Sequence, residues 1–294
     1  MLHDDPRLYS GGDRAIEVEL GDGMDFTLNF MVHSLAAAIR KSQIRGLEDL
    51  IPELASLQLN YDPDVISYED LGCEVLRLYD GIRGAITGEL PSRLITVPVL
   101  YFDPETTNCI LDYRNKYPDK VSDPDLVANL NGIAERTDLA RIHAGTEYWV
   151  AALGFWPGLC SLMPLDPRAR LVAPKYNPPR TWTPKGSIGI GGALTCIYPD
   201  KTPGGYQLIG QTPVPTYDAA QRLPAFRDSL ALFRAGDRVR FRPIGPLEYT
   251  EIKTRVDEGQ YVHDIVDYQL FSVDRYLRWT KSIADLPANA GVGK

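Results

Sequence analysis

Hydrophobic and polar residues alternate in two short stretches of the N-terminal third of the chain. Residues 14–20 and residues 56–61 place apolar side chains at every second position, which predicts two half-buried strands. Residues 27–41 and 68–82 instead carry apolar side chains at spacings of three and four, the pattern of an amphipathic helix. The order strand, helix, strand, helix predicts a small α+β N-terminal domain, which we place at residues 1–92.

The pattern changes after this domain. Residues 94–102 are mostly apolar and predict a buried strand. Two helical segments follow. We expect Asp123 to cap the first, with Pro124 in its first turn, and Thr137 to cap the second. From Glu147 onward, proline and glycine separate short apolar runs, which is typical of a β-barrel with structured loops.

The predicted barrel domain occupies residues 93–248. The remaining segment, residues 249–294, is predicted to be a C-terminal extension with a helix that begins near Ser272. The fold class expected from these patterns is therefore α+β.

The composition narrows the possible partners and the cellular location. The chain has 39 acidic and 31 basic residues, a net charge of -8, which disfavours nucleic acid and anionic membrane as general partners. Residues 1–6 lack the basic and apolar regions of a secretory signal, and the apolar stretch 148–160 is too short to span a bilayer. The four cysteines form no C-x-x-C pair and are expected to be buried, reduced thiols. These features predict a cytoplasmic protein.

Several reaction classes lack their sequence signatures. The four histidines are isolated from one another and from the cysteines, so no metal site is expected. There is no G-x-S-x-G elbow, no Walker A sequence and no Met-Lys-Met biotinylation sequence. Any ATP or carboxyl carrier that the reaction needs is therefore expected to come through a partner.

Residues 154–212 combine glycine with positive charge. Between Asp166 and Gly186 there are five basic residues and one acid, a local charge of +4 in an acidic chain. Glycines such as those of residues 186–192 let backbone N–H groups approach a ligand closely. The segment is compatible with an anion or carboxylate pocket, and equally with turns between barrel strands that carry solvated cations.

Two other positions have alternative interpretations. His143 is expected on the last turn of a short helix, where it is compatible with packing or capping and equally with ligand binding or proton transfer. Residues 238–242 alternate arginine with apolar residues, which predicts a strand whose arginines face solvent.

Four segments, in this order, resemble the allophanate hydrolase subunit 1 family. They are residues 154–158 (GFWPG), 179–181 (PRT), 186–191 (GSIGIG) and 203–212 (PGGYQLIGQT). That family includes KipI, the B component of 5-oxoprolinase and the first half of the urea carboxylase carboxyltransferase domain. Residues 175–181 (KYNPPRT) look more like urea carboxylase than KipI.

The resemblance implies a cyclophilin-like β-barrel after the N-terminal domain, and a subunit of a carboxyltransferase assembly that is inactive alone. A carboxyl group would move from carboxybiotin, held by a partner carrier and not by this chain, to urea or a similar amide or guanidine. The implied partners are a subunit 2 of the same family and a biotin carboxylase with its carrier, through which ATP would act. Developing negative charge would be stabilised by backbone amides and by Arg or Lys side chains.

The resemblance also implies roles for individual residues. The expected catalytic residues are Lys175, Asn177, Arg180 and His143. The expected substrate-binding residues are Tyr206, Gln207, Gly204 and Gly205, and the expected cofactor-binding residues are Gly191 and Gly192. We further expect the partner subunit to cover the apolar loop residues Phe155, Trp156 and Leu159.

Two alternative functions remain open at this point. One is a component like that of 5-oxoprolinase, in which partners use ATP to open a lactam. The other is a KipI-like binding protein that inhibits a histidine kinase.

Overall fold

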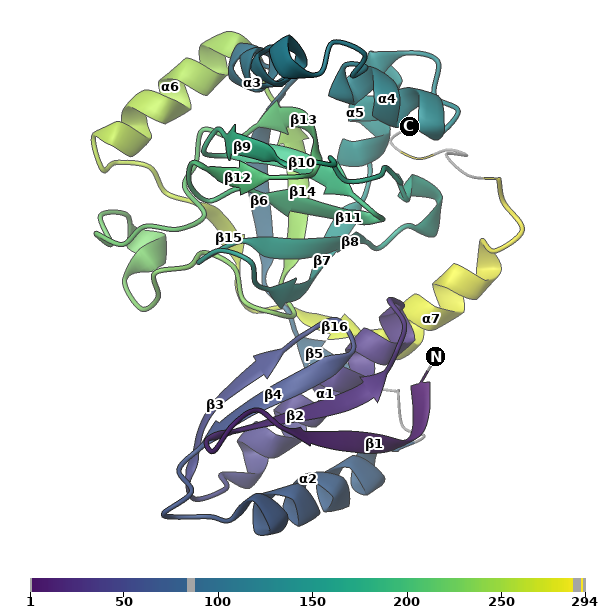
Figure 1. Ribbon diagram of the computed structural model, residues 1–294, viewed down its shortest axis with the longest axis vertical. Coiled ribbons are helices and arrows are strands. Elements are labelled where there is room, and N and C mark those ends of the chain that lie inside the picture. Colours follow the sequence, from purple (N-terminus) through teal and green to yellow (C-terminus); the bar gives the residue numbers. More distant parts are fainter. Residues whose placement is uncertain (1, 84–87, 288–291, 293–294) are drawn as a thin grey trace. The chain divides into compact units, whose positions relative to one another are not determined.

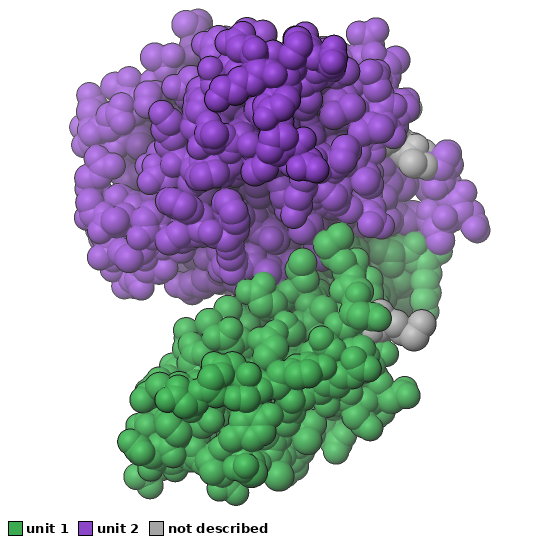
Figure 2. All heavy atoms as spheres, in the orientation of Figure 1, with its two compact units in different colours: residues 1–91, 270–281 green, residues 92–269, 282–294 purple. Residues whose placement is uncertain are grey.

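The computed structural model describes residues 2–83, 88–287 and 292, and the chain forms two compact units. Unit 1 comprises residues 1–91 and 270–281, and unit 2 comprises residues 92–269 and 282–294 (Figure 2). The segment 249–294, which we treated as a single extension, is therefore divided between the two units.

Unit 1 contains a four-stranded antiparallel sheet in the order β1-β2-β4-β3 (Figure 1). Inward-facing residues of the sheet, such as Ile16 and Val18, pack with apolar residues of helix α1, such as Leu35, in one core. Asp25 caps α1 by accepting a hydrogen bond of 2.9 Å from the N–H of Leu28. The bounds are β1 Leu2–Ser10, β2 Ala15–Gly21, α1 Phe26–Ser42, β3 Leu47–Pro52, β4 Ser56–Tyr61 and α2 Tyr68–Ile82.

Segments far apart in the sequence meet within unit 1. Strand β5 (Glu89–Pro91) pairs with strand β16 (Leu270–Ser272), and helix α7 (Val273–Ser282) follows directly. The ring of Tyr276 on α7 lies 5.3 Å from the ring of Phe26 and 5.6 Å from that of Phe30, centroid to centroid. Aromatic burial of this kind explains why residues 270–281 belong to the N-terminal unit.

Unit 2 is built on a closed seven-stranded β-barrel in the order β13-β10-β11-β8-β7-β14-β6, closed by the pairing of β13 with β6. All neighbours are antiparallel except β14 and β6, which run parallel, and β15 adds a short antiparallel pairing to β6. The predicted α+β fold class, with a barrel after a small N-terminal sheet, is confirmed. The bounds are β6 Leu94–Tyr101, β7 Glu147–Leu153, β8 Cys160–Pro164, β10 Ser187–Gly191, β11 Leu194–Ile197, β13 Gln207–Gln211, β14 Arg238–Pro243 and β15 Asp264–Val266.

Helices α3, α4, α5 and α6 gather at one end of the barrel (Figure 1). A pair of short strands, β9 and β12, lies beside them. The bounds are α3 Pro104–Lys116, α4 Asp123–Leu130, α5 Arg136–Ala144, β9 Arg180–Thr183, β12 Thr202–Gly204 and α6 Pro246–Asp257. Helix α3, which we did not predict, is capped by Asp103, whose side chain accepts from the N–H of Thr106 at 2.9 Å.

The predicted helix caps were wrong in detail. The residues that precede α4 and α5 are Ser122 and Glu135, whereas Asp123 is the first residue of α4 and Thr137 lies inside α5. The side chain of Asp123 is buried in the interior of unit 2, where it binds side chains and backbone from other elements. None of the helices in the described part of the chain is long and apolar enough to cross a membrane.

Candidate functional site

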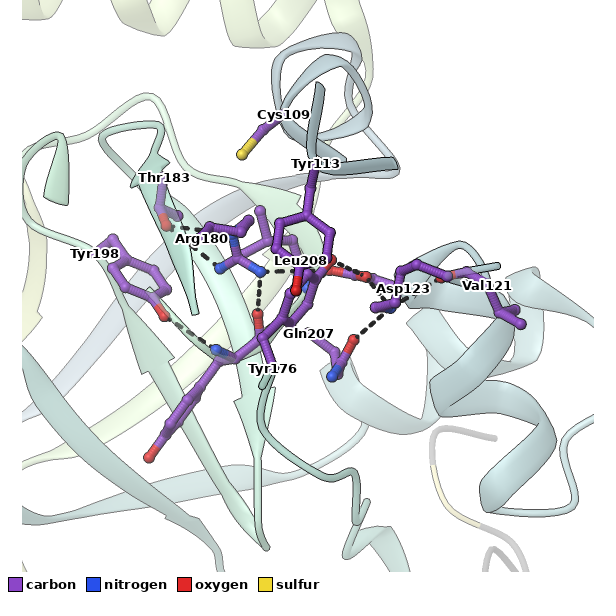
Figure 3. A network of polar contacts seen from close by, with 12 residues as sticks. Cys109, Tyr113, Val121, Asp123, Tyr176, Arg180, Thr183, Tyr198, Gln207 and Leu208 are labelled. Carbon is purple, nitrogen blue, oxygen red and sulfur yellow. Dashed lines mark hydrogen bonds and ion pairs between the residues drawn. The ribbon is translucent and has the colours of Figure 1, made fainter. Parts of the chain in front are cut away.

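A carboxylate without access to solvent lies where helix α4 meets strand β13. The side chain of Asp123 is 0% exposed. Its Oδ2 accepts a hydrogen bond of 2.7 Å from the backbone N–H of Leu208, and its Oδ1 accepts hydrogen bonds from Lys120 Nζ at 2.7 Å and from the hydroxyl of Tyr176 (Figure 3). A buried carboxylate is costly unless donors satisfy it, and these three donors do so.

Two cations share this one carboxylate. Besides Lys120, the guanidinium of Arg180 forms an ion pair with Asp123, at 3.8 Å between Nη1 and Oδ2. Arg180 is only 2% exposed, stacks over the ring of Tyr176 with 4.4 Å from Cζ to the ring centroid, and donates to the backbone oxygen of Tyr206 at 2.8 Å. The guanidinium also donates to Thr183 Oγ1 at 3.3 and 3.4 Å.

The protonation states of this network follow from burial and from its neighbours. Burial, and then the charge of Asp123, raise the pKa of the Tyr176 phenol, so Tyr176 stays neutral and donates. Burial alone would lower the pKa of Arg180, but neighbouring tyrosines and Asp123 raise it, so the guanidinium stays charged. The three charged groups therefore sum to +1.

The same network fixes two loop segments against each other. The N–H of Tyr176 donates to the oxygen of Gly205 at 2.6 Å, and Nε2 of Gln207 donates to the oxygen of Pro174 at 2.6 Å. Lys120 Nζ donates to Oε1 of Gln207 at 3.0 Å. The side-chain amide of Gln207 is thus occupied by Lys120 and Pro174, which makes it part of the framework of the site.

Two of the expected catalytic residues project from this framework. Lys175 and Asn177 flank Tyr176, and both are exposed. Lys175 Nζ lies 5.4 Å from the centroid of the Tyr206 ring, a cation–π contact. Within the described chain, neither Lys175 nor Asn177 has a side-chain hydrogen bond or ion pair, so their N–H donors remain available.

The four glycines that we expected to bind ligands make contacts within the protein. A Cβ at Gly191 would lie 2.4 Å from the ring of Tyr206, and one at Gly204 would lie 2.5 Å from Thr183 Oγ1, so both positions require glycine for close approach. Gly192 exchanges two backbone hydrogen bonds with Ala173, which occupies the amide that we expected to cradle a ligand. Gly205 contributes its oxygen to the N–H of Tyr176.

His143 lies apart from these residues, in the interior of the barrel. Its Nδ1 is 2.7 Å from the hydroxyl of Tyr101, its Nε2 is 3.4 Å from Thr195 Oγ1, and its ring packs 4.6 Å from that of Phe241. Burial lowers the pKa of His143 to about 3, so the imidazole is neutral. Both ring nitrogens lie beside hydroxyls of barrel strands, and this geometry favours the packing interpretation.

Three expectations about exposure need correction. Cys73 is exposed, whereas the other three cysteines are buried as expected. Arg238 does not face solvent on the wet side of its strand, because it contacts Glu147 at 2.8 Å and Ser92 at 3.3 Å in a partly buried position. In the loop between β7 and β8, Phe155 and Trp156 are 71% and 39% exposed, whereas Leu159 packs inside.

Sequence reasoning missed the centre of the network. Lys120 and Asp123 lie three residues apart, in a segment whose acid and proline indicated only the start of a helix. The available signal was their spacing, since a lysine and an aspartate at this spacing can contact each other. That the pair is buried and paired with Arg180 depends on the barrel, which the spacing does not reveal.

This fold is that of a known class of protein domain. Residues 6–227 match the family model described as carboxyltransferase domain, subdomain C and D. The match covers well over half of the chain. The chain therefore belongs to the carboxyltransferase domain family. The resemblance inferred from the sequence motifs, to the family that includes urea carboxylase and the B component of 5-oxoprolinase, is confirmed.

Individual members of the family show which proteins this chain is similar to. The chain is 31% identical to urea amidolyase of Saccharomyces cerevisiae over 282 residues, which cover 93% of this chain and 15% of the yeast protein. It is 32% identical to the B component of 5-oxoprolinase from Bacillus subtilis over 244 residues, 82% of this chain and 94% of that protein.

The crystal structure of Kluyveromyces lactis urea carboxylase matches with a TM-score of 0.83 and 27% identity, over 97% of this chain and 26% of that one. The chain thus spans only a small part of the length of urea amidolyase and urea carboxylase, and most of the length of the oxoprolinase component.

Proposed function

We propose that this chain is one half of a biotin-dependent carboxyltransferase, acting as subunit 1 of an assembly that moves a carboxyl group from carboxybiotin to urea or to a similar amide or guanidine. The observation that carries the proposal is the pair of available N–H donors, Lys175 and Asn177, on a segment that the Asp123 network holds in place. The relationship to urea carboxylase over almost the whole chain supports the reaction class.

The chemistry of these donors suits a biotin ureido group. Carboxybiotin supplies an activated carboxyl group when it is bound. Donors already held in position would stabilise negative charge on the ureido oxygen of a bound biotin without reorganising. Lys175 and Asn177 would hold that oxygen, and the flat ring of Tyr206 beside Lys175 would pack against the bicyclic ring.

The substrate would be positioned by Tyr206. Burial raises the pKa of its phenol to about 12, so the hydroxyl is neutral at physiological pH and can donate to or accept from an amide. Holding a small neutral substrate next to the carboxyl donor converts a bimolecular step into one within a complex, which lowers the barrier substantially. Arg180, Asp123 and Gln207 would act as positioning residues.

Partner chains would supply the other parts. In this proposal a subunit 2 of the same family completes the site, and a biotin carboxylase with its carrier uses ATP to load biotin. The chain alone should therefore be inactive and should carry no biotin. A streptavidin-reactive band at its own mass, 32.7 kDa, would contradict the carrier assignment.

The direct experiment is reconstitution of the assembly with labelled bicarbonate, ATP and urea or guanidine. Label should enter the substrate only when this chain, subunit 2 and the biotin protein are all present, and avidin should abolish transfer. Transfer that proceeds equally well without this chain would refute the proposal.

A second candidate is a component of a 5-oxoprolinase, favoured by the match to 94% of the Bacillus subtilis protein. The two candidates differ in their need for biotin. ATP-dependent opening of 5-oxoproline by the chain and its partners, unaffected by avidin, would select this second function.

A further inference from the structure

A cavity of about 190 Å³ lies between helix α3 and the segment that leads into strand β9. Aromatic and proline side chains form much of its wall. The rings of Tyr113 and Tyr117 stack on each other with centroids 4.6 Å apart, and Trp182 and Pro178 also line the cavity.

Three hydrogen bonds hold the two sides of this cavity together. The hydroxyl of Tyr113 donates to the oxygen of Pro178 at 2.8 Å, the indole N–H of Trp182 donates to Asp112 at 2.9 Å, and the thiol of Cys109 donates to the oxygen of Trp182 at 3.4 Å. Each bond joins α3 to residues 178–182. The cavity is therefore formed before any ligand binds, which lowers the entropic cost of binding.

The charges around the cavity favour an anion. Arg180 lines it and belongs to the buried network in which one carboxylate serves two cations, leaving an excess of +1. Excess charge in a buried site is costly, so an anion nearby would stabilise it. Lys116 also lines the cavity, is exposed, and makes no hydrogen bond or ion pair with any residue that the structure describes. Asp112 is the one acid of the lining, against the two cations Lys116 and Arg180, and one of its oxygens accepts from the indole N–H of Trp182.

The volume limits the size of the ligand. Water takes about 30 Å³ per molecule in the liquid, so the cavity holds the equivalent of roughly six waters. Flat aromatic walls favour a planar body, and guanidinium and ammonium groups favour a carboxylate. Urea has no charge to match this lining.

We propose that the cavity between α3 and β9 binds a small planar carboxylate, with its charged end toward Lys116 and Arg180 and its flat body against Tyr113, Tyr117 and Trp182. Arg180 belongs both to the lining of this cavity and to the network that supports the segment of Lys175 and Asn177. The inference does not depend on carboxyl transfer, because binding is measured on the chain itself.

The test is calorimetric titration of the full chain with benzoate and with benzamide, its neutral analogue of the same shape. Benzoate should bind saturably, and benzamide about tenfold more weakly or worse, because it lacks the charge. Lys116→Gln should weaken benzoate about fivefold or more and leave benzamide unchanged. The matched control is Arg114→Gln, which removes a cation from the same helix outside this cavity and should leave benzoate affinity within about twofold.

Trp182→Leu should weaken both probes, and thermal melts of this variant separate loss of the wall from loss of the fold. Lys116 is exposed, so its variant tests the proposal even if Trp182→Leu does not fold. Equal affinity for benzoate and benzamide, an unchanged benzoate affinity in Lys116→Gln, or no saturable benzoate binding at about 10 mM would overturn the proposal.

Discussion

The carboxylate of Asp123 lies 3.8 Å from the guanidinium of Arg180, and neither residue is more than 2% exposed. The pair joins the start of helix α4 to the start of strand β9, two elements that lie more than fifty residues apart in sequence. Through Tyr176 it also supports the segment that carries Lys175 and Asn177. A buried pair of this kind contributes mainly by fixing geometry, since desolvation offsets much of its attraction.

Removing the carboxylate should strongly destabilise unit 2. Asp123→Ala leaves Arg180 and Lys120 without their shared partner and the N–H of Leu208 without an acceptor. We expect a loss of about 3–5 kcal/mol in the free energy of unfolding, measured by chemical denaturation.

The control for that experiment is Asp125→Ala on the same helix, whose ion pair with Arg136 is exposed. It should cost no more than about 1 kcal/mol. Similar losses for the two variants would show that the Asp123 network does not support the fold as described.

Arg180 should not tolerate lysine. An ammonium group cannot reproduce the contacts of the guanidinium with the oxygen of Tyr206 and with Thr183, nor its stacking on Tyr176. Arg180→Lys should cost about 2 kcal/mol of unfolding free energy. Arg240→Lys, whose side chain is half exposed beside Glu147, should stay within about 0.5 kcal/mol. An Arg180→Lys melt that overlays the wild type would show that these guanidinium contacts do not stabilise the fold.

The exposed loop between β7 and β8 should contact the partner subunit. Replacing Phe155 and Trp156 together by serine removes the largest apolar area of the loop while leaving the buried Leu159 in place. The variant should fold normally but lose co-elution with subunit 2 in size-exclusion chromatography. Tyr268→Ser, at another highly exposed aromatic of unit 2, serves as the control and should co-elute like the wild type. Retained co-elution of the double variant would exclude this loop from the interface.

His143 should make stability depend on pH. Its pKa in the folded chain, about 3, lies below the ordinary value of 6.5, so the unfolded chain binds the extra proton between these values. The native state is therefore fully favoured above pH 6.5 and loses stability as pH falls toward 3. His143 should account for about 2 kcal/mol of loss between pH 8 and pH 5.

The variant His143→Gln removes this titration and should show a correspondingly smaller pH slope, whatever its absolute stability. Denaturation curves of both proteins at pH 8 and pH 5 give the comparison. Identical slopes would mean that His143 is protonated as readily in the folded chain as in the unfolded one.

The sequence predicted the fold better than it predicted the site. Period-two and helical spacing placed β2, β4, α1 and α2 to within about two residues, because one face of each element is buried. Strand β1 was missed because polar residues dominate it, and α3 because its apolar face is narrow.

Within the site, the resemblance selected Lys175, Arg180 and Tyr206, which the fold brings near one another. The resemblance did not show that Lys175 is exposed and Arg180 buried, because burial depends on which other elements pack against a residue. Asp123 and Lys120 escaped notice for the same reason, since their partners come from strands more than fifty residues away.

The most direct test of the account measures carboxyl transfer by the reconstituted assembly with Lys175→Ala and Asn177→Ala. Each variant should lose about thirtyfold in turnover, near 2 kcal/mol of transition-state stabilisation, with an unchanged melting temperature because both side chains are exposed. Lys185→Ala, another exposed lysine of the same basic segment, should keep its rate within about twofold. Equal, small effects at all three positions would contradict the assignment of this surface as the carboxyltransferase site.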